Sequence, residues 1–224
     1  LDGLAAVLAE QHAVTDLDVH GIQVALVVAT AGADGVRRAV LRDAPEGRVT
    51  RITRERAGEL AQDPLYRDAQ VWLDGFTAAT GRCAGRVPGT GAWTDTHREF
   101  YRFINLTTRQ LDGLLLPESF SARGYVRLLE SFVARCAEFR ATEQALGQIP
   151  SLAEEARTSL ALEFLAAKAF AALAWPVVPE MSQRVWDWLG LPGHPVREAE
   201  WSFLPAGTEC GAPAPGLATV AGRP

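Results

Sequence analysis

The chain has 224 residues, 48% of them hydrophobic and 22% charged, which is the ordinary balance of a globular protein with one good core. No apolar run reaches the roughly 18 to 20 residues that a membrane-spanning helix needs, and we recognise no export signal, so we expect a cytoplasmic protein without membrane contact. The net charge is −5, and Lys168 is the only lysine among 22 lysine and arginine residues, which disfavours general binding of polyanions.

The first 50 residues carry mixed signals. Leu1–Ala13 has apolar residues at helical spacing and is predicted to be a helix. Val19–Ala31 combines β-branched residues, typical of strands, with a length typical of helices, and we interpret it as a helix. A short helix is predicted at Asp34–Leu41, followed by a turn at Asp43–Gly47.

From Thr53 onward, apolar residues recur every three or four positions, and proline and most glycine fall between the periodic segments. Ser121 and Ser151 are predicted N-caps, the latter with Glu154 as a capping box. We therefore predict an all-α helix bundle with a short N-terminal mixed segment and an extended C-terminal tail. The helices are predicted at residues 54–62, 64–84, 95–115, 121–146, 151–174 and 179–189.

Candidate catalytic residues are few. Asp95, His97, Glu99 and Tyr101 form a polar group in which His97 is a candidate acid or base. On a helix these residues spread around the surface, so we interpret them as a capped and solvated helix start. No serine, histidine and acid occur at a motif spacing, and no glycine-rich phosphate loop is present.

Three cysteines, two tryptophans and the segment between two predicted helices are the remaining candidates for a functional site. Cys83, Cys136 and Cys210 are odd in number and far apart, which favours thiols over a disulfide framework or a zinc site, and we expect no metal. One of Trp186 and Trp188 is expected in the core and the other half-exposed, rather than both in an aromatic ligand box. Leu114–Arg123 is interpreted as a linker rather than a partner-facing loop.

A family resemblance begins at Phe170. The run Trp175-Pro176-Val177-Val178-Pro179-Glu180, followed by Leu189-Gly190-Leu191, resembles the closing helices of class I aminoacyl-tRNA synthetases, most of all the methionyl type. In that family an apolar helix ends at a Pro-x-x-Pro-Glu corner, and the next helix ends in Leu-Gly-Leu. The physics agrees, because Pro176 cannot continue a helix interior, Pro179 suits a first turn and Gly190 suits a left-handed cap.

Two further matches extend the resemblance over about 180 residues. Gly32–Arg38, followed by Pro45-Glu46, is similar to a run near the end of the family's catalytic region. The tail is similar to the family's ending in its ordered positions Trp201, Pro205, Gly207, Pro213, Pro215 and Leu217. The resemblance implies a junction at residues 1–50, a helix bundle of the anticodon-binding type at 51–193 and an extended tail at 194–224.

The two ATP motifs of the family are absent. These are a His-x-Gly-His sequence and a Lys-Met-Ser-Lys-Ser loop, and His20-Gly21-Ile22-Gln23 has the wrong order. Those motifs stabilise phosphate charge during adenylate formation. We therefore expect no complete catalytic site and no cofactor in this chain, and ATP only with a catalytic synthetase-like domain or subunit as partner.

The anticodon-reading residues that the resemblance implies look eroded. The family places an asparagine four residues before an arginine on the first bundle helix, and here the pair becomes Ala78 and Arg82. The family's Pro-Trp, whose ring stacks on an anticodon base, becomes Glu143 and Gln144. Losing an aromatic platform removes roughly 1 to 3 kcal/mol of stacking, and a carboxylate adds repulsion from RNA.

Three functions remain open within this interpretation. The chain could be the tRNA-contacting domain of a genuine methionyl-tRNA synthetase. It could instead be the helical part or partner subunit of a paralogue that joins amino acids in specialised metabolism, which the eroded site and the acidic charge favour. The third alternative is a non-catalytic scaffold or interaction module, whose exposed apolar surface is expected within residues 1–50.

Overall fold

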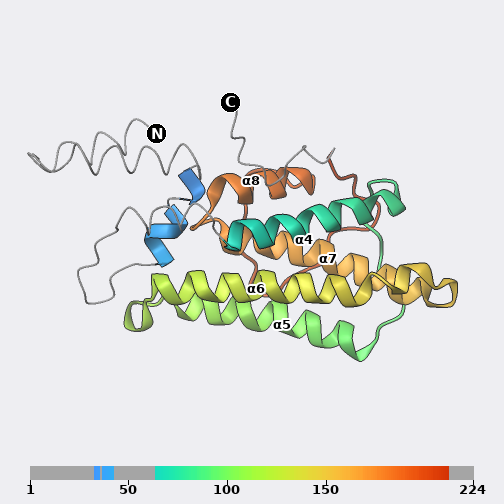
Figure 1. Ribbon diagram of the computed structural model, residues 1–224, viewed down its shortest axis with the longest axis horizontal. Helices are drawn as coiled ribbons and strands as arrows, with labels where there is room; N and C mark the ends of the chain where they lie inside the picture. Colours follow the sequence, from blue (N-terminus) through green and yellow to red (C-terminus); the bar gives the residue numbers. More distant parts are fainter. Residues whose placement is uncertain (1–32, 36, 43–63, 212–224) are drawn as a thin grey trace, which may run out of the picture.

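The computed structural model describes residues 33–35, 37–42 and 64–211, and most of these residues are in helices (Figure 1). Helical turns at 33–35 and 37–42 agree with the short helix predicted at Asp34–Leu41. The predicted helices at 1–13, 19–31 and 54–62, and the turn at 43–47, lie outside the described residues. The α-helices are α4 (Pro64–Thr80), α5 (Asp95–Gly113), α6 (Ala122–Glu143), α7 (Ala153–Ala174) and α8 (Pro179–Trp188). Short 3-10 turns are η1 (Gly81–Cys83), η2 (Pro117–Ser119), η3 (Leu146–Gln148) and η4 (Pro150–Leu152).

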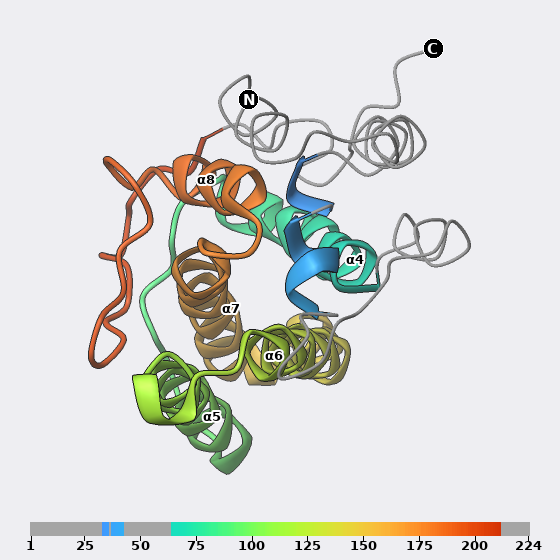
Figure 2. The same cartoon turned by 90° about the vertical axis from the view of Figure 1, so that its left-hand side faces the viewer.

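The central element of the bundle is α7. Figure 2, which looks nearly along the helices, shows α7 surrounded by α4, α5, α6 and α8. Every residue from Thr158 to Ala174 is buried. A helix that is apolar on all sides can be stable only where neighbours cover every side. The all-α bundle is therefore confirmed, with α7 enclosed at its centre from Thr158 to Ala174.

Local capping explains where most helices begin and end. The Ser121 hydroxyl accepts a hydrogen bond from the Gly124 N–H, which confirms this N-cap of α6. Pro179 lies in the first turn of α8, and Gly190 follows that helix with φ +72°, as expected. The capping box predicted at Ser151 is wrong, because the chain enters α7 through η4 and the N-cap position falls on Leu152, which makes no side-chain cap.

The expectation of one core and one half-exposed tryptophan on α8 is wrong. Trp188 packs edge-on against Phe76 of α4, with ring centroids 5.2 Å apart. Trp186 donates its indole N–H to the Pro192 carbonyl. Both rings are buried, because α8 has the bundle on one side and the chain returning after Gly190 on another.

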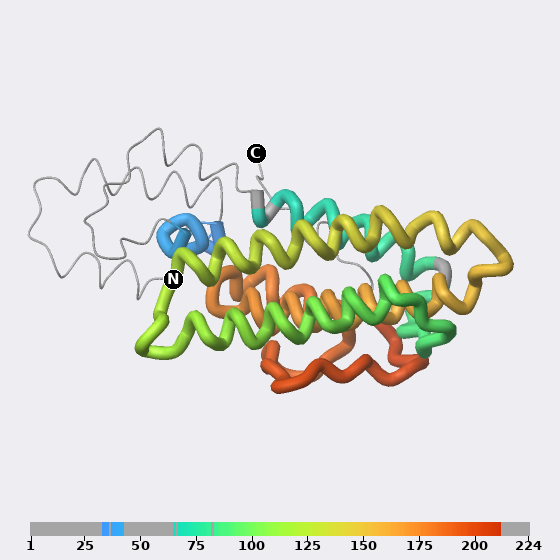
Figure 3. The backbone as a smooth tube through the Cα atoms, turned by 90° about the horizontal axis from the view of Figure 1, so that it is seen from below, coloured from blue at the N-terminus to red at the C-terminus, as the bar shows by residue number. Residues whose placement is uncertain are grey.

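Residues 194–211 form a non-helical segment that we call the strap (Figure 3). The strap crosses the bundle beside α5 and α7 and reaches the turn after α4. Trp201 is its main anchor: this side chain is 1% exposed, and its indole N–H donates to Thr108 Oγ1 at 2.7 Å. The backbone N–H of Trp201 donates to Asn105 Oδ1. The predicted domain boundaries at residues 50 and 193 stay predictions.

No helix within the described ranges is both long and apolar enough to cross a membrane.

Candidate functional site

A buried polar cluster connects three helices near the start of α5. Thr94 is the N-cap of α5, and its hydroxyl accepts a hydrogen bond from the His97 N–H at 3.2 Å. In return, the Thr94 N–H donates to His97 Nδ1 at 3.1 Å, which completes a reciprocal capping box. The helix start is capped as predicted, but the solvated interpretation is wrong for His97, which is fully buried.

The other ring nitrogen of His97 faces α6 and α7. Its Nε2 lies 3.0 Å from Glu143 Oε2 and 2.8 Å from Ser159 Oγ. Ser159 Oγ itself donates to Glu143 Oε2 at 2.6 Å. Because Nδ1 accepts from a backbone N–H, we assign the ring proton to Nε2, where the imidazole acts as a donor. We call these three side chains the His97 cluster.

The His97 cluster contains a serine, a histidine and an acid, but its geometry is not that of an acyl-transfer site. In a catalytic triad, the serine and the acid bind opposite nitrogens of the imidazole. Here both bind Nε2, so the imidazole cannot accept the serine proton there, and that proton already points to the carboxylate. No side chain of the cluster exceeds 7% exposure. The arrangement holds α5, α6 and α7 together and offers no accessible nucleophile.

A buried ion pair lies one helical turn from the His97 cluster. Arg140 of α6 donates to Glu163 of α7 at 2.7 Å, and the two side chains are 10% and 5% exposed. Gly75 of α4 leaves room for the guanidinium, since a Cβ there would lie 2.9 Å from Arg140 Nε. Nearby, burial first and the charge of Glu163 second raise the pKa of the Cys136 thiol well above its ordinary value, which disfavours its thiolate.

An open groove of about 350 Å³ lies beyond these clusters, where the turn after α4 meets the connection between α6 and α7. The charged side chain in the lining of this groove is that of Arg157, which donates a hydrogen bond to Glu154 at 2.6 Å. Among the described residues, no aromatic side chain lines the groove. Its lining residues are Cys83, Pro88, Gly147, Gln148, Ile149, Pro150, Ala153, Ala156, Arg157 and Leu160.

The four proposed anticodon-site equivalents lie close to this end of the bundle. Ala78 is exposed on the last turn of α4, Arg82 lies in η1, and Gln144 is exposed at the C-cap of α6. Glu143 instead turns inward to the His97 cluster, so its carboxylate is not a surface charge that would repel RNA. Sequence reasoning missed Ser159 and Glu163, which lie within an apolar helix without a motif.

Within the described ranges, no group of three or more histidine, cysteine, aspartate or glutamate side chains could hold a metal ion. The carboxylates of the polar clusters are instead paired with an arginine, a histidine and a serine.

The fold of this chain is similar to part of a known class of enzymes. No protein-family model and no curated protein matches the chain. Among solved structures, the fold matches the helical part of methionyl-tRNA synthetases. The apo enzyme of Mycobacterium tuberculosis gives a TM-score of 0.73 at 22% identity, covering 90% of this chain and 41% of the synthetase. The methionyl-adenylate complex of the same enzyme gives 0.72 at 22% identity, covering 88% and 39%. The chain thus has a methionyl-tRNA synthetase-like fold and spans about two fifths of the length of those synthetases.

Proposed function

We propose that this bundle is the helical part of a methionyl-tRNA synthetase-like cytoplasmic protein that joins amino acids in specialised metabolism rather than reading an anticodon. A catalytic synthetase-like domain or subunit, which binds ATP, is its partner in this proposal. The chain itself supplies the support and the surface on which that partner packs.

The observation that carries the proposal is the composition of the groove between the turn after α4 and the α6–α7 connection. Single-stranded RNA recognition relies on aromatic rings that stack on splayed bases. Aliphatic, glycine and proline residues dominate this groove, and none of its described lining residues is aromatic. Trp72, Trp186, Trp188 and Trp201 are buried and present no ring face to a base. The other two tryptophans, Trp93 and Trp175, are half-buried, and neither lines the groove.

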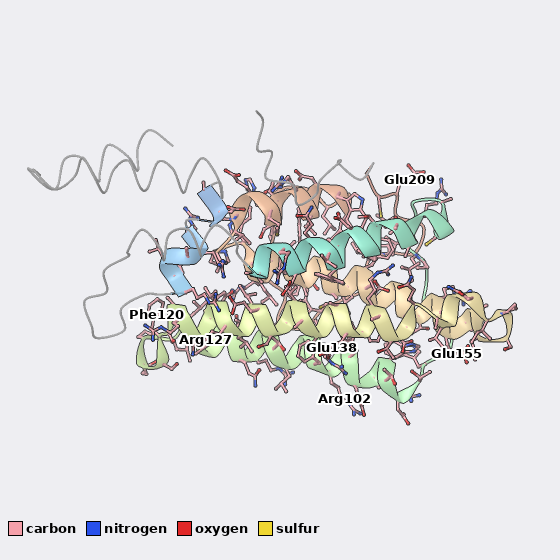
Figure 4. The ribbon with its side chains drawn as sticks, viewed as in Figure 1. Arg102, Phe120, Arg127, Glu138, Glu155 and Glu209 are labelled. Carbon is pink, nitrogen blue, oxygen red and sulfur yellow. The ribbon has the colours of Figure 1, made fainter. Side chains whose placement is uncertain are left out.

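Two surface features favour the alternatives. Arg102 and Arg127 are exposed on α5 and α6 (Figure 4) and suit phosphate contacts, as the tRNA-contacting domain of a genuine synthetase would need. Leu115, Leu116 and Phe120 are 44%, 54% and 62% exposed at the α5–α6 connection, which favours a scaffold that contacts a protein there. That exposure also favours a partner-facing loop over a plain linker.

The first experiment measures binding of an unmodified tRNA with a methionine anticodon across a salt series. The matched control is the same tRNA with another anticodon. We expect equal binding of the two at every salt concentration, weak and steeply salt-dependent because only phosphates are contacted. The double variant Arg102→Gln with Arg127→Gln should lower the salt slope by about two. A clear preference for the methionine anticodon would contradict the proposal and favour the genuine synthetase.

The second experiment adds a catalytic partner. Purified chain alone should not catalyse amino-acid-dependent exchange between ATP and pyrophosphate. Together with its partner, it should support ATP-dependent joining of two amino acids without tRNA. Amino-acid activation that yields product only when tRNA is added would reject the proposal.

A further inference from the structure

The end of the strap is hydrogen-bonded to the turn that follows α4. The Val87 N–H donates to the Thr208 carbonyl at 2.9 Å, and the Cys210 N–H donates to the Gly85 carbonyl at 2.8 Å. Arg86 and Glu209 lie opposite each other in this antiparallel bridge, and their side chains form an ion pair of 2.6 Å. Figure 4 shows Glu209 beside the turn after α4. Two segments more than a hundred residues apart therefore meet in a defined register.

This register brings two cysteines together. Cys210 is opposite Gly85, and Cys83 lies two residues before Gly85, on a turn that the Arg86 N–H closes by donating to the Cys83 carbonyl at 3.0 Å. Diagonally opposed residues of paired segments are about 7 to 8 Å apart, which is close to the limit of about 7 Å between the Cα atoms of a disulfide. Cys83 is also near enough to contribute, after burial, to the raised pKa of the Cys210 thiol. Both side chains are half-buried and carry thiols, whereas Cys136 is fully buried on α6.

We propose that Cys83 and Cys210 form a reversible disulfide that fastens the strap to the turn after α4. Neither cysteine belongs to an α-helix, since Cys83 lies in the short turn η1 and Cys210 in the strap. Cys83 also lines the groove described above, so the bond would change one wall of that groove.

The bond forms by two exchanges with a small disulfide such as glutathione disulfide. The Cys83 thiolate attacks one sulfur of that molecule, forms a mixed disulfide and releases one glutathione thiolate. The Cys210 thiolate then attacks the Cys83 sulfur and releases the second. Two protein thiols are oxidised, one glutathione disulfide is reduced to two glutathiones, and the two thiol protons pass to the released thiolates.

The surroundings of Cys210 assign the order of attack. Burial, and secondly the nearby Cys83, raise the pKa of the Cys210 thiol to about 11, so it remains protonated at neutral pH. Only the thiolate is nucleophilic, so in this proposal Cys210 acts second, as the resolving thiol. Its attack becomes faster as pH rises towards that value.

The experiment treats the reduced chain with glutathione disulfide at pH 8 and maps linked peptides by mass spectrometry without reduction. Wild type and Cys136→Ala should both lose two thiols and give one peptide pair joined through Cys83 and Cys210. Cys210→Ser should instead keep a glutathione adduct on Cys83. Oxidation should raise the Tm of wild type by about 5 to 10 °C and slow proteolysis within residues 194–211.

Glutathione adducts on both cysteines of the wild type, without the joined peptide pair, would overturn the proposal. Links that form only between molecules and rise with protein concentration would also overturn it. If the Cys83–Cys210 disulfide forms but changes neither the Tm nor the rate of proteolysis within the strap, then it does not fasten the strap to the turn after α4. Because none of these measurements involves tRNA or a catalytic partner, the result is independent of the proposed function.

Discussion

Helix α7 contributes one buried charged side chain to the bundle and another to the contact with the strap. The two ion pairs differ in how exposed their members are. In the bundle, Glu163 meets Arg140 between helices, and both side chains are at most 10% exposed. On the strap side, Lys168 contacts Glu198, whose side chain is 30% exposed, and Lys168 also donates to the Ser202 carbonyl. An enclosed pair cannot replace a lost partner with water, whereas a pair at an edge can. The bundle should therefore respond to substitution as one unit, and the strap should detach locally.

The largest effect is expected from Glu163→Leu. Removing one member of an enclosed ion pair leaves Arg140 without its carboxylate and should lower the free energy of unfolding by about 3 to 5 kcal/mol. Denaturant unfolding measures this loss, and the transition should stay cooperative. The double variant Glu163→Leu with Arg140→Met should recover most of it. If the double variant is as unstable as the single one, the ion pair is not the cause.

Trp201→Ala tests the strap as a separate unit. Loss of a buried tryptophan costs about 3 kcal/mol, and here the cost should fall on the strap alone. We expect rapid proteolysis within residues 194–211 while the bundle keeps its helical circular dichroism. Glu200→Ala, at an exposed neighbouring residue, is the control and should change neither. A cooperative collapse of the whole protein would show that strap and bundle form one unit.

His97→Ala tests how much the His97 cluster stabilises the bundle. The variant loses the side-chain partner of the Thr94 N–H and one donor to buried Glu143, so we expect a loss of about 2 kcal/mol. Chemical denaturation gives the value. Exposed Arg98→Ala is the matched control from the same helix turn, with a change below about 0.5 kcal/mol. Equal effects of the two would contradict the structural role of the His97 cluster.

Gly190→Ala tests the junction between bundle and strap. Gly190 has φ +72°, and a Cβ there would lie 2.7 Å from the Glu209 carbonyl oxygen. The strained backbone should cost about 1 to 2 kcal/mol and displace the end of the strap. Gly193 also has a positive φ, but no atom lies within 4 Å of the Cβ position there. Gly193→Ala therefore measures the cost of the strained backbone alone, without a steric clash. Faster strap proteolysis in Gly193→Ala than in Gly190→Ala would refute the close approach.

The smallest effect is expected from Glu198→Gln, which should cost at most about 1 kcal/mol because the ion pair is partly exposed. Burial alone would raise the pKa of Glu198, but hydrogen bonds from Lys168 and Ser202 outweigh it and hold that pKa below its ordinary value. A depressed pKa stabilises the folded state above the ordinary value, and this stability is lost as pH falls through the folded value. Denaturant unfolding should show the stability of wild type falling by this small amount as pH drops through the folded pKa, and Glu198→Gln should lack that pH dependence.

Local sequence predicted local structure well. The Ser121 cap, Pro179 in a first turn and the left-handed Gly190 each depend on one residue and its immediate neighbours. The five described α-helices fall within the predicted ranges for the same reason. The Ser151 cap failed because Pro150 starts a 3-10 turn, so the serine is already inside it.

Contacts between distant residues could not be predicted in the same way. His97 and Glu143 are 46 residues apart, and no motif connects them. The same holds for Arg86 and Glu209, whose pairing joins the end of the strap to the turn after α4. Sequence determined the helices, their ends and the apolar character of α7, because hydrogen bonding and backbone angles depend on near neighbours. Only the tertiary structure decided which polar side chains meet, because that depends on which helix faces pack together and on where the strap returns.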